Sequence, residues 1–204
     1  GLIGGSLAKA IKKTHQSEIV FGFGRDKSRL EKAQKSNVID QYSTDIGEAL
    51  DGANMVIIAI PVGSYESILK EMKPHIVKDM IISDVGSTKV SVIEAVKTVF
   101  GNTLDNFIPA HPISGKEKVG FEVSDADLFV DKKVIITPHE SNNPDSIKIL
   151  VNMWKEVGAE VDFMTPQSHD DLLGMTSHLP HMLAFSLVNY LISKHPEASV
   201  YAAG

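Results

Sequence analysis

The sequence predicts an α/β fold in residues 1–164, a parallel sheet covered by helices, followed by the start of an all-α domain in residues 165–204. Short apolar segments alternate with helical segments of about ten residues, which is typical of βαβ units. One segment, residues 54–60, is apolar without interruption, as in a strand buried on both faces. From Thr165 to about Ser193 the sequence is helical and apolar, which marks a change of architecture.

Composition narrows the class of protein. The chain has 204 residues, 43% hydrophobic and 23% charged, which is ordinary for a soluble globular protein. A net charge of −6 argues against nucleic acid as a partner, so an anionic small substrate would need a local basic site. No apolar run approaches the roughly 20 residues of a membrane span, and the first residues do not form a signal peptide. The absence of cysteine excludes disulfides and Cys-ligated zinc and fits a cytoplasmic protein.

The chain opens with half of a nucleotide-binding motif. Gly1 and Gly4 match the second and third glycines of G-x-G-x-x-G, Leu2 and Ile3 lie between them, and an apolar helix continues to about Thr14. In that motif glycine lets the backbone approach a pyrophosphate, and the helix N-terminus directs free N–H groups at the anion. The first glycine and the strand before it are missing. A glycine-rich chain end is the alternative, but the βαβ series that follows favours a dinucleotide-binding, Rossmann-like domain.

The remaining elements follow from apolar periodicity and from turn residues. Strands are expected at residues 18–23, 38–39, 54–60, 80–83, 107–110, 132–138 and 158–163, and helices at residues 27–36, 45–50, 64–72 and 144–157. The last of these helices carries Ile147, Leu150, Val151 and Trp154 on one face, so Trp154 is expected in the core rather than in a site. Thr165 is expected to cap the final helix, with Pro166 as its first residue.

The end of the second strand of the Rossmann-like domain bears on cofactor choice. NAD-selective domains place an acidic residue there to bind the ribose 2′-OH, whereas a nearby Arg accommodates the 2′-phosphate of NADP. Here Gly24 stands at the expected position of the acid and Arg25 follows, which favours NADP over NAD. Two alternatives stay open. Asp26 caps the next helix beside a solvated Arg25, or Asp26 reaches the ribose.

Two polar motifs follow predicted strands, Asp84 to Lys89 and His111 to Gly115. In open α/β sheets that edge is where ligands bind. The first motif offers the Ser87 hydroxyl and a lysine ammonium, and the second offers an imidazole. A histidine near a hydroxyl suits proton transfer near neutral pH. Two ordinary turns with a surface histidine are the alternative.

Three histidines lie on the last predicted helix. His178 and His181 are three positions apart and share a face, whereas His169 is roughly 120° out of line with His181 unless Pro180 kinks the helix. No carboxylate or further histidine has convincing zinc-ligand spacing, so no metal is expected. Histidines satisfied at a domain interface are the alternative. The remaining histidines are read as surface or capping residues: His15, His75, His139 and His195.

Together these motifs resemble the prephenate/arogenate dehydrogenase family of tyrosine biosynthesis. The matching segments span nearly the whole chain in the family's order and are residues 1–6, 59–62, 84–89, 111–115 with Glu117, and 177–181. The resemblance implies a Rossmann-like domain followed by a helical dimerisation domain, hence a homodimer. It also implies oxidative decarboxylation of an anionic cyclohexadienyl acid. Whether that acid is prephenate or arogenate, and whether tyrosine inhibits the enzyme, stay open.

The resemblance assigns roles residue by residue. His111 matches the catalytic histidine that bonds the ring hydroxyl, and Ser87 matches the serine that supports this histidine and the substrate. The substrate is expected at His181, His169, Ser114, Gly115 and Lys89. The cofactor is expected at Gly1, Leu2, Ile3, Gly4, Arg25, Pro61, Val62, Asp84 and Gly86. Ser114 and Lys116 depart from the family, where Ala and Thr or Ser are commoner, and this departure could alter substrate preference. The family's carboxylate-binding arginine is expected beyond Gly204.

The chemistry is consistent with these residues. Hydride removal from a carbinol carbon requires loss of the hydroxyl proton, which a neutral His111 can accept while Ser87 fixes its tautomer. Loss of carbon dioxide then makes the ring aromatic. Two other functions stay open: a β-hydroxyacid-type dehydrogenase, which would use a lysine on the helix after the sheet, and a non-catalytic nucleotide-sensing module.

Overall fold

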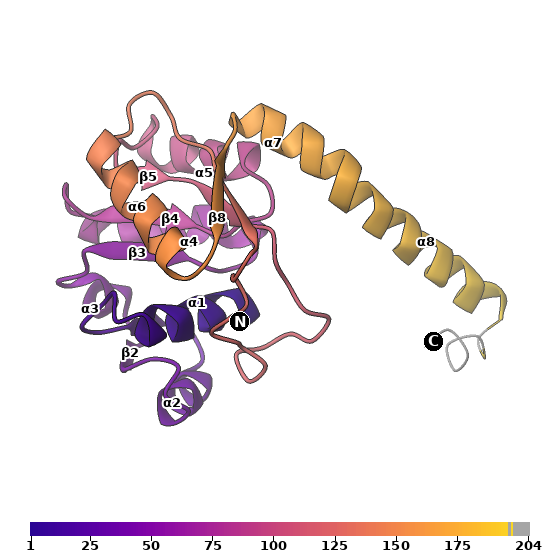
Figure 1. Cartoon of the computed structure of the whole chain (residues 1–204), viewed down its shortest axis with the longest axis horizontal. Helices are drawn as coiled ribbons and strands as arrows, with labels where there is room; N and C mark the ends of the chain where they lie inside the picture. The colour runs from indigo at the N-terminus through magenta and orange to yellow at the C-terminus, as the bar shows by residue number, and fades with distance from the viewer. Residues whose placement is uncertain (196, 198–204) are drawn as a thin grey trace.

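The computed structural model describes residues 1–195 and 197. In it strands alternate with helices up to the final helical segment, except for three successive strands in residues 107–136 (Figure 1). The strands are β1 (Phe21–Phe23), β2 (Gln41–Ser43), β3 (Met55–Ile58), β4 (Ile81–Asp84), β5 (Phe107–Ile108), β6 (Ala110–Pro112), β7 (Lys133–Ile136) and β8 (Glu160–Phe163). The α-helices are α1 (Leu2–Lys13), α2 (Lys27–Lys35), α3 (Ile46–Leu50), α4 (Tyr65–Met72), α5 (Val90–Phe100), α6 (Pro144–Glu156), α7 (Pro166–Leu173) and α8 (Leu179–Lys194). Short 3-10 turns cover Val62–Ser64 and Lys73–His75.

The strands form three hydrogen-bonded groups, β1–β2, β3–β4–β5 and β6–β7–β8. All pairs are parallel except β6 with β7, so the expectation of a purely parallel sheet is wrong at this position. The single strand expected at residues 107–110 is also divided at Pro109 into β5, which pairs with β4, and β6, which pairs with β7. Pro109 has no N–H to give to a ladder, but its carbonyl accepts a hydrogen bond from the Thr137 N–H at 2.9 Å. The chain therefore passes from one group of strands to the next at this proline.

The central strands are buried on both faces, as their unbroken apolar sequence predicts. Ile81 of β4 packs in one core cluster with side chains of α1 and α6. The next residue, Ile82, packs in another with side chains of α4 and α5. Helices on both sides of a mostly parallel sheet confirm the predicted α/β fold (Figure 1).

Two details of the core bear on the sequence predictions. Trp154 is 0% exposed and packs edge-on against Phe129 with ring centroids 5.3 Å apart, so its predicted place in the core is confirmed. The strand expected at residues 38–39 lies further along, at β2. Val38 and Ile39 are instead buried against Ala8 and other residues of a third core cluster. Burial rather than sheet pairing explains their apolar character.

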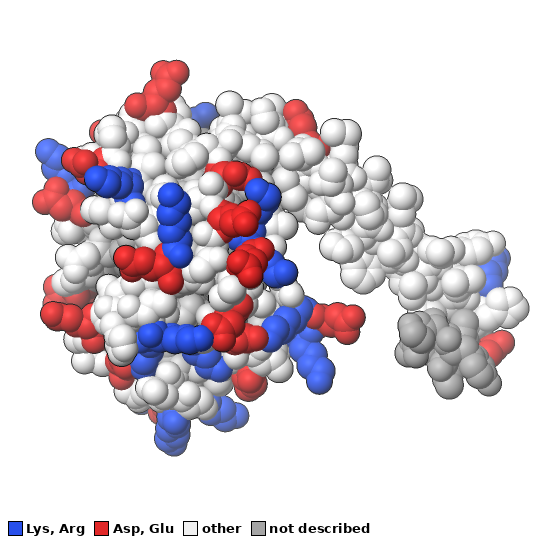
Figure 2. Space-filling model, in the orientation of Figure 1, with Lys and Arg blue, Asp and Glu red and all other residues white. Residues whose placement is uncertain are grey.

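The final helical segment extends away from the α/β body (Figure 1). Thr165 caps α7 by accepting a hydrogen bond from the Ser168 N–H at 3.1 Å, as predicted. A π-helical turn, Gly174–His178, lies between α7 and α8, and Pro180 follows it in the first turn of α8. Helix α8 buries none of its residues and carries one Lys and no acidic side chain, so it is almost free of blue and red in Figure 2. Within the described residues, no helix has the length and hydropathy needed to cross a membrane.

Candidate functional site

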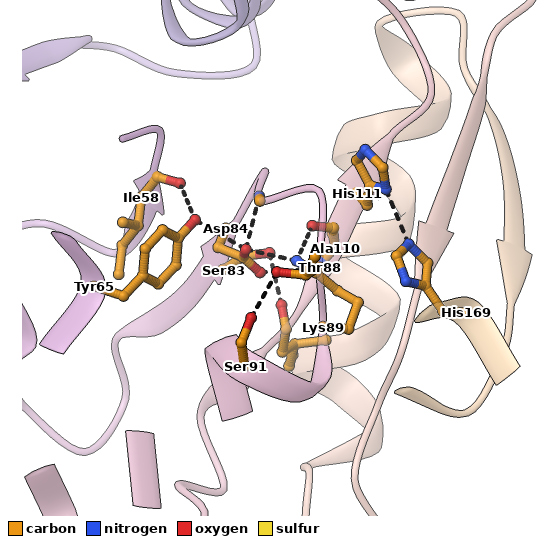
Figure 3. Close-up of polar contacts among 12 residues, drawn as sticks. Ile58, Tyr65, Ser83, Asp84, Thr88, Lys89, Ser91, Ala110, His111 and His169 are labelled. Atoms are coloured by element: carbon orange, nitrogen blue, oxygen red, sulfur yellow. Dashed lines mark hydrogen bonds and ion pairs between the residues drawn. The ribbon is translucent and has the colours of Figure 1, made fainter. Parts of the chain in front are cut away.

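Two clusters of polar side chains meet where the central strands end (Figure 3). One, the buried clamp, consists of Tyr65, Asp84, Gly86, Lys89 and the peptide of Ala110. The other, the histidine relay, links β6 to α7 and is described below. Asp84 ends β4 and lies in register with Ile58, the last residue of β3, which places both clusters at the edge where α/β folds bind ligands.

The buried clamp is centred on the Asp84 carboxylate. Its Oδ2 accepts hydrogen bonds from the Lys89 ammonium at 2.6 Å, the Tyr65 hydroxyl at 3.0 Å and the Gly86 N–H at 2.8 Å. The side chains of Asp84 and Lys89 are both 0% exposed. Burial lowers the pKa of Lys89, while the neighbouring Asp84 opposes that change, and burial together with Asp84 raises the pKa of Tyr65. A side chain at Gly86 would meet Asp84 Oδ2 at 2.8 Å, so the clamp requires glycine there.

The clamp fixes the backbone immediately before His111. Asp84 Oδ1 accepts a hydrogen bond from the Ala110 N–H at 3.1 Å, and Lys89 donates to the Ala110 carbonyl at 2.7 Å. The peptide groups of Ala110 are thus held from two sides by one ion pair. The start of β6, and with it the direction in which His111 leaves the strand, is determined by side chains from β4 and the start of α5.

Three of the predicted site residues lie inside this clamp. Lys89 is enclosed by protein and bonded to Asp84 and Ala110. Asp84 and Gly86 are buried within the same clamp, and the predicted contacts of the three with substrate or cofactor stay predictions. Their motif follows a strand at the ligand-binding edge. Its two charged groups, Asp84 and Lys89, bond to each other and to the backbone of Ala110. The sequence could not show this, because Tyr65 and Ala110 come from distant segments.

The histidine relay consists of His111, His169 and Asp170. His111 Nδ1 lies 2.9 Å from His169 Nε2, and the two rings meet edge to face with centroids 5.1 Å apart. His169 Nδ1 lies 2.7 Å from Asp170 Oδ1. The relay therefore leaves His111 Nε2 as the ring nitrogen that takes no part in the chain of hydrogen bonds (Figure 3).

Burial governs the charge of both histidines. It lowers the pKa of His111 to about 3, assisted by the positive charges of Lys89, His169 and His178 and opposed by Asp170. Burial likewise lowers the pKa of His169, against the effect of its hydrogen bond to Asp170. Both rings are consequently neutral at pH 7, and a neutral imidazole is the form that accepts a proton.

Asp170 also joins the helical segment to the α/β body. Its Oδ1 accepts a hydrogen bond from the Lys89 N–H at 2.7 Å, and its Oδ2 accepts one from the Val90 N–H at 2.9 Å. These N–H groups open α5, which has no cap from its own N-cap side chain. Burial alone would raise the pKa of Asp170, but the two backbone hydrogen bonds and the one from His169 lower it. Neither Asp170 nor His178 is among the predicted site residues. Their positions in the sequence are the one indication of a role, because Asp170 directly follows His169 and His178 lies three positions before His181.

Ser87 and His169 differ in how they lie toward His111. Ser87 is exposed on the loop before α5, and in the part of the chain that the structure describes it makes no hydrogen bond to His111. The side chain that hydrogen-bonds the His111 ring is His169, which is itself 0% exposed. The predicted roles of Ser87 and His169 toward a substrate stay predictions.

The other predicted substrate residues differ in exposure. Ser114 Oγ is buried and has no hydrogen-bond partner among the described residues, while Gly115 beside it is exposed with open space where a side chain would be. His181 is exposed on α8, one helical turn beyond the half-buried His178. An unpartnered buried hydroxyl costs free energy, so Ser114 Oγ is a group that a ligand could satisfy.

The predicted cofactor residues differ in their surroundings. Gly1 is exposed at the N-terminus of α1, and a Cβ on Gly4 would lie 2.9 Å from Ala59 Cβ, so Gly4 allows α1 to pack closely on the chain that leaves β3. Leu2 and Ile3 are partly buried against the core. Pro61 is exposed and Val62 half-buried after β3. Arg25 is exposed after β1, whereas Asp26 accepts a hydrogen bond from the Arg29 N–H at 3.2 Å and caps α2, which favours the capping interpretation of Asp26.

Within the described residues no group of three or more His, Asp or Glu side chains is arranged to hold a metal ion. Three further features bear on what the site can do: the exposed N-terminus of α1, the exposed Arg25 after β1 and the neutral His111 on β6. That combination can hold a phosphate-bearing cofactor beside a group that accepts a proton.

Comparison with known proteins gives a consistent result. Residues 7–163 match the family model described as prephenate dehydrogenase, nucleotide-binding domain, and residues 165–204 match prephenate dehydrogenase, dimerization domain. A curated cyclohexadienyl dehydrogenase of Zymomonas mobilis is 34% identical over 188 residues, which is 92% of this chain and 64% of that protein. A prephenate dehydrogenase of Bacillus subtilis is 33% identical over 208 residues, 100% of this chain and 56% of that protein.

A solved structure is similar over the same range. The crystal structure of prephenate dehydrogenase from Aquifex aeolicus, in complex with hydroxyphenyl propionate and NAD+, superimposes with a TM-score of 0.87 at 32% identity. The match covers 94% of this chain and 66% of that one. The chain thus spans between 56% and 64% of the length of the two curated relatives.

Proposed function

The chain belongs to the prephenate dehydrogenase family, and on that premise we propose that the full-length protein oxidatively decarboxylates prephenate or arogenate with transfer of a hydride to a nicotinamide cofactor. The observation that carries this proposal is His111, a neutral imidazole on β6 at the ligand-binding edge of the sheet. Its Nδ1 is engaged by His169, so Nε2 is left to meet a ligand.

His111 acts as the general base. The ring hydroxyl of the substrate gives its proton to His111 while the hydride leaves the same carbon, so that a carbonyl forms without a build-up of positive charge. The carbon–carboxylate bond then breaks, carbon dioxide departs, and its electron pair makes the ring aromatic. A bound nicotinamide cofactor supplies the hydride acceptor. Asp170 is joined to His111 through His169, and its negative charge favours the His111 imidazolium that forms.

Three residues supply the substrate contacts in this proposal. Ser87 is exposed beside the start of α5, so we assign it to the substrate rather than to His111. Ser114 offers the buried hydroxyl that lacks a partner, next to the open backbone of Gly115. His181 offers an exposed imidazole on α8. These groups donate hydrogen bonds that suit an anionic, hydroxylated ring.

NAD is the cofactor that the Aquifex aeolicus complex holds, and the residues of this chain fit a dinucleotide. We propose a preference for NADP because Gly24, rather than an acidic residue, follows β1 and because Arg25 beside it is exposed. If Arg25 grips a 2′-phosphate, Arg25→Ala should weaken NADP use by about ten- to a hundredfold, the value of a charge-assisted hydrogen bond, and leave NAD use nearly unchanged. Equal effects on both cofactors, or none, would refute this preference.

Helix α8 is proposed to pair with a second copy of the chain. Large apolar side chains such as Phe185 and Met182 are 69% and 64% exposed on it, and exposed apolar surface of this extent marks association. The match of residues 165–204 to a dimerization domain supports the same assignment. Sedimentation of the full-length protein as a dimer is expected, and a monomer at micromolar concentration would remove the idea.

One assay tests the function. The full-length protein is incubated with NAD or NADP and with prephenate or arogenate, and the absorbance of the reduced cofactor is followed. We expect turnover with at least one of the four combinations, and the ratio of their kcat/KM values identifies the physiological pair. Turnover of a β-hydroxyacid in the absence of any with the cyclohexadienyl acids would overturn the proposal.

A further inference from the structure

The carboxylate of Asp170 touches both the histidine relay and the first turn of α5, so one side chain of the helical segment bears on the reacting group and on the α/β body. We propose that Asp170 is a positioning residue that acts through His169 to hold His111 in the tautomer with its proton on Nδ1 and a free lone pair on Nε2. The inference rests on the proposed function, in which His111 accepts the substrate proton.

The direction of the hydrogen bonds follows from the chemistry of the end group. An ionised carboxylate can only accept, so His169 Nδ1 must donate to Asp170 Oδ1 across 2.7 Å. A neutral His169 carries only one proton, so its Nε2 must accept, and the donor across 2.9 Å is His111 Nδ1. His111 Nε2 is then the basic nitrogen. A charged His169 would donate from both ring nitrogens, and His111 Nδ1 would then accept instead of donate. Burial lowers the pKa of His169 and so keeps this ring neutral.

The second set of contacts explains why Asp170 stays ionised and in place. The N–H groups of Lys89 and Val90 bind its two oxygens at 2.7 Å and 2.9 Å, and both belong to the start of α5. A helix N-terminus favours a negative charge, and two donors fix the plane of the carboxylate. Oδ1 is shared between Lys89 and His169, so the orientation that caps α5 is the one that receives the relay.

The tautomer of His111 therefore depends on whether α7 of the helical segment is packed against α5. His169 and Asp170 come from α7, whereas His111 comes from β6 and the cap donors from α5. When α7 lies on α5, the relay is complete and His111 has its lone pair on Nε2. Without that contact nothing in the described part of the chain selects between the two tautomers of His111.

The direct test is the protonation pattern of the His111 ring in the full-length protein, read from ¹⁵N chemical shifts of the two ring nitrogens. In the parent protein we expect a protonated Nδ1 and a bare Nε2. In Asp170→Ala we expect a mixture of tautomers together with a fall in kcat of about ten- to a hundredfold, less than complete loss of a general base, and little change in KM.

A control and a second variant separate the relay from the cap. Asp171→Ala removes the same charge one residue away, from an exposed side chain that only accepts a hydrogen bond from Gln167, and should leave the shifts and kcat at the parent values. His169→Leu breaks the relay but leaves Asp170 as the cap of α5. It should reproduce the tautomer mixture and the loss of kcat without the loss of stability that uncapping α5 brings.

A proton on Nε2 in the parent, or ring shifts unchanged in both Asp170→Ala and His169→Leu, would overturn the proposal. Because the nitrogen shifts require no substrate, they test the relay even if the turnover assay fails. A failed turnover assay would count against the proposed function alone.

Discussion

The buried clamp and the histidine relay lie side by side at one edge of the sheet, yet they are built differently. In the clamp, the Asp84 carboxylate receives four hydrogen bonds and no part of Asp84 or Lys89 reaches solvent. In the relay, His111 is only partly buried and one of its ring nitrogens has no partner within the chain of hydrogen bonds. The clamp, in which the polar groups bond to one another, stabilises the fold. The relay, which ends in a ring nitrogen that is not hydrogen-bonded within the relay, can accept a proton from a ligand.

The two clusters also position different parts of His111. The clamp fixes the backbone at Ala110, and the relay fixes the ring through His169. If this division is right, changes at the two histidines of the relay should reduce turnover at nearly constant stability, and changes in the clamp should reduce stability first.

The largest effect is expected from His111→Asn. Asparagine can still hydrogen-bond the substrate hydroxyl but cannot accept its proton, so kcat should fall by about 10²–10⁴-fold with KM little changed. The free energy of unfolding should stay close to that of the parent, since the His111 side chain is only partly buried and asparagine leaves the backbone pairing of β6 in place. If the variant keeps more than about a tenth of the parent kcat, far short of general-base loss, the base must be sought among His169, His178 and His181.

His181→Asn should instead raise KM more than it lowers kcat, because we assign His181 to substrate binding.

Lys89→Met should give the largest loss of stability. Removing one partner of a buried ion pair leaves the Asp84 charge uncompensated, and such changes cost about 3–5 kcal/mol. Denaturant unfolding of the purified protein measures this loss. The matched control is Lys70→Met, which removes an exposed ion pair with Glu66 and should cost no more than about 0.5 kcal/mol. Equal losses in the two variants would contradict the structural role of the clamp.

Tyr65→Phe tests the same cluster more gently. The hydroxyl gives hydrogen bonds to Asp84 Oδ2 at 3.0 Å and to the Ile58 carbonyl at 3.2 Å, and the ring is 0% exposed. Its removal leaves Lys89 and Gly86 on the carboxylate, so we expect a loss of about 1–3 kcal/mol, smaller than that of Lys89→Met. A cost as large as that of Lys89→Met would mean that the ion pair is not the main element of the clamp.

The last prediction on stability concerns its dependence on pH. The folded state lowers the pKa of His111 from 6.5 to about 3, so the unfolded chain takes up a proton that the folded chain refuses. The stabilisation from neutral His111 is thus fully present above pH 6.5 and is lost progressively as the pH falls towards 3. The free energy of unfolding should decline across that range, and the decline should be shallower in His111→Asn. Identical slopes would show that His111 titrates normally in the folded protein.

Several parts of this account could be predicted from the sequence. The βαβ order, the buried Trp154 and the cap at Thr165 follow from local signals, namely apolar periodicity and turn residues, and the structure confirms them. The sequence predicts that His111 follows a strand, whereas the structure places it within the short strand β6. The antiparallel pairing of β6 does not follow from local signals, because it depends on where the chain turns after Pro112, and the sequence there gives no period.

The partners of each polar side chain could not be predicted, because they come from distant segments. Lys89 and Asp84 are five positions apart, but the pair is buried only because Tyr65 and Ala110 close over it. His111 and His169 are 58 positions apart, and Asp170 lies 80 positions from the N–H of Val90. Residue type indicated which groups can transfer protons, while the fold determined which of them are enclosed.

The pH dependence of kcat/KM tests the central claim, that His111 is the base, most directly. On the acid side this ratio reports groups of the free enzyme that must be deprotonated. In the parent we expect a loss that corresponds to one proton, with a midpoint below 6.5 because burial lowers the pKa of His111. In His111→Asn that loss should vanish and the low residual activity should be independent of pH over the same range. Persistence of the loss in the variant, at the parent midpoint, would show that the proton is accepted by another group.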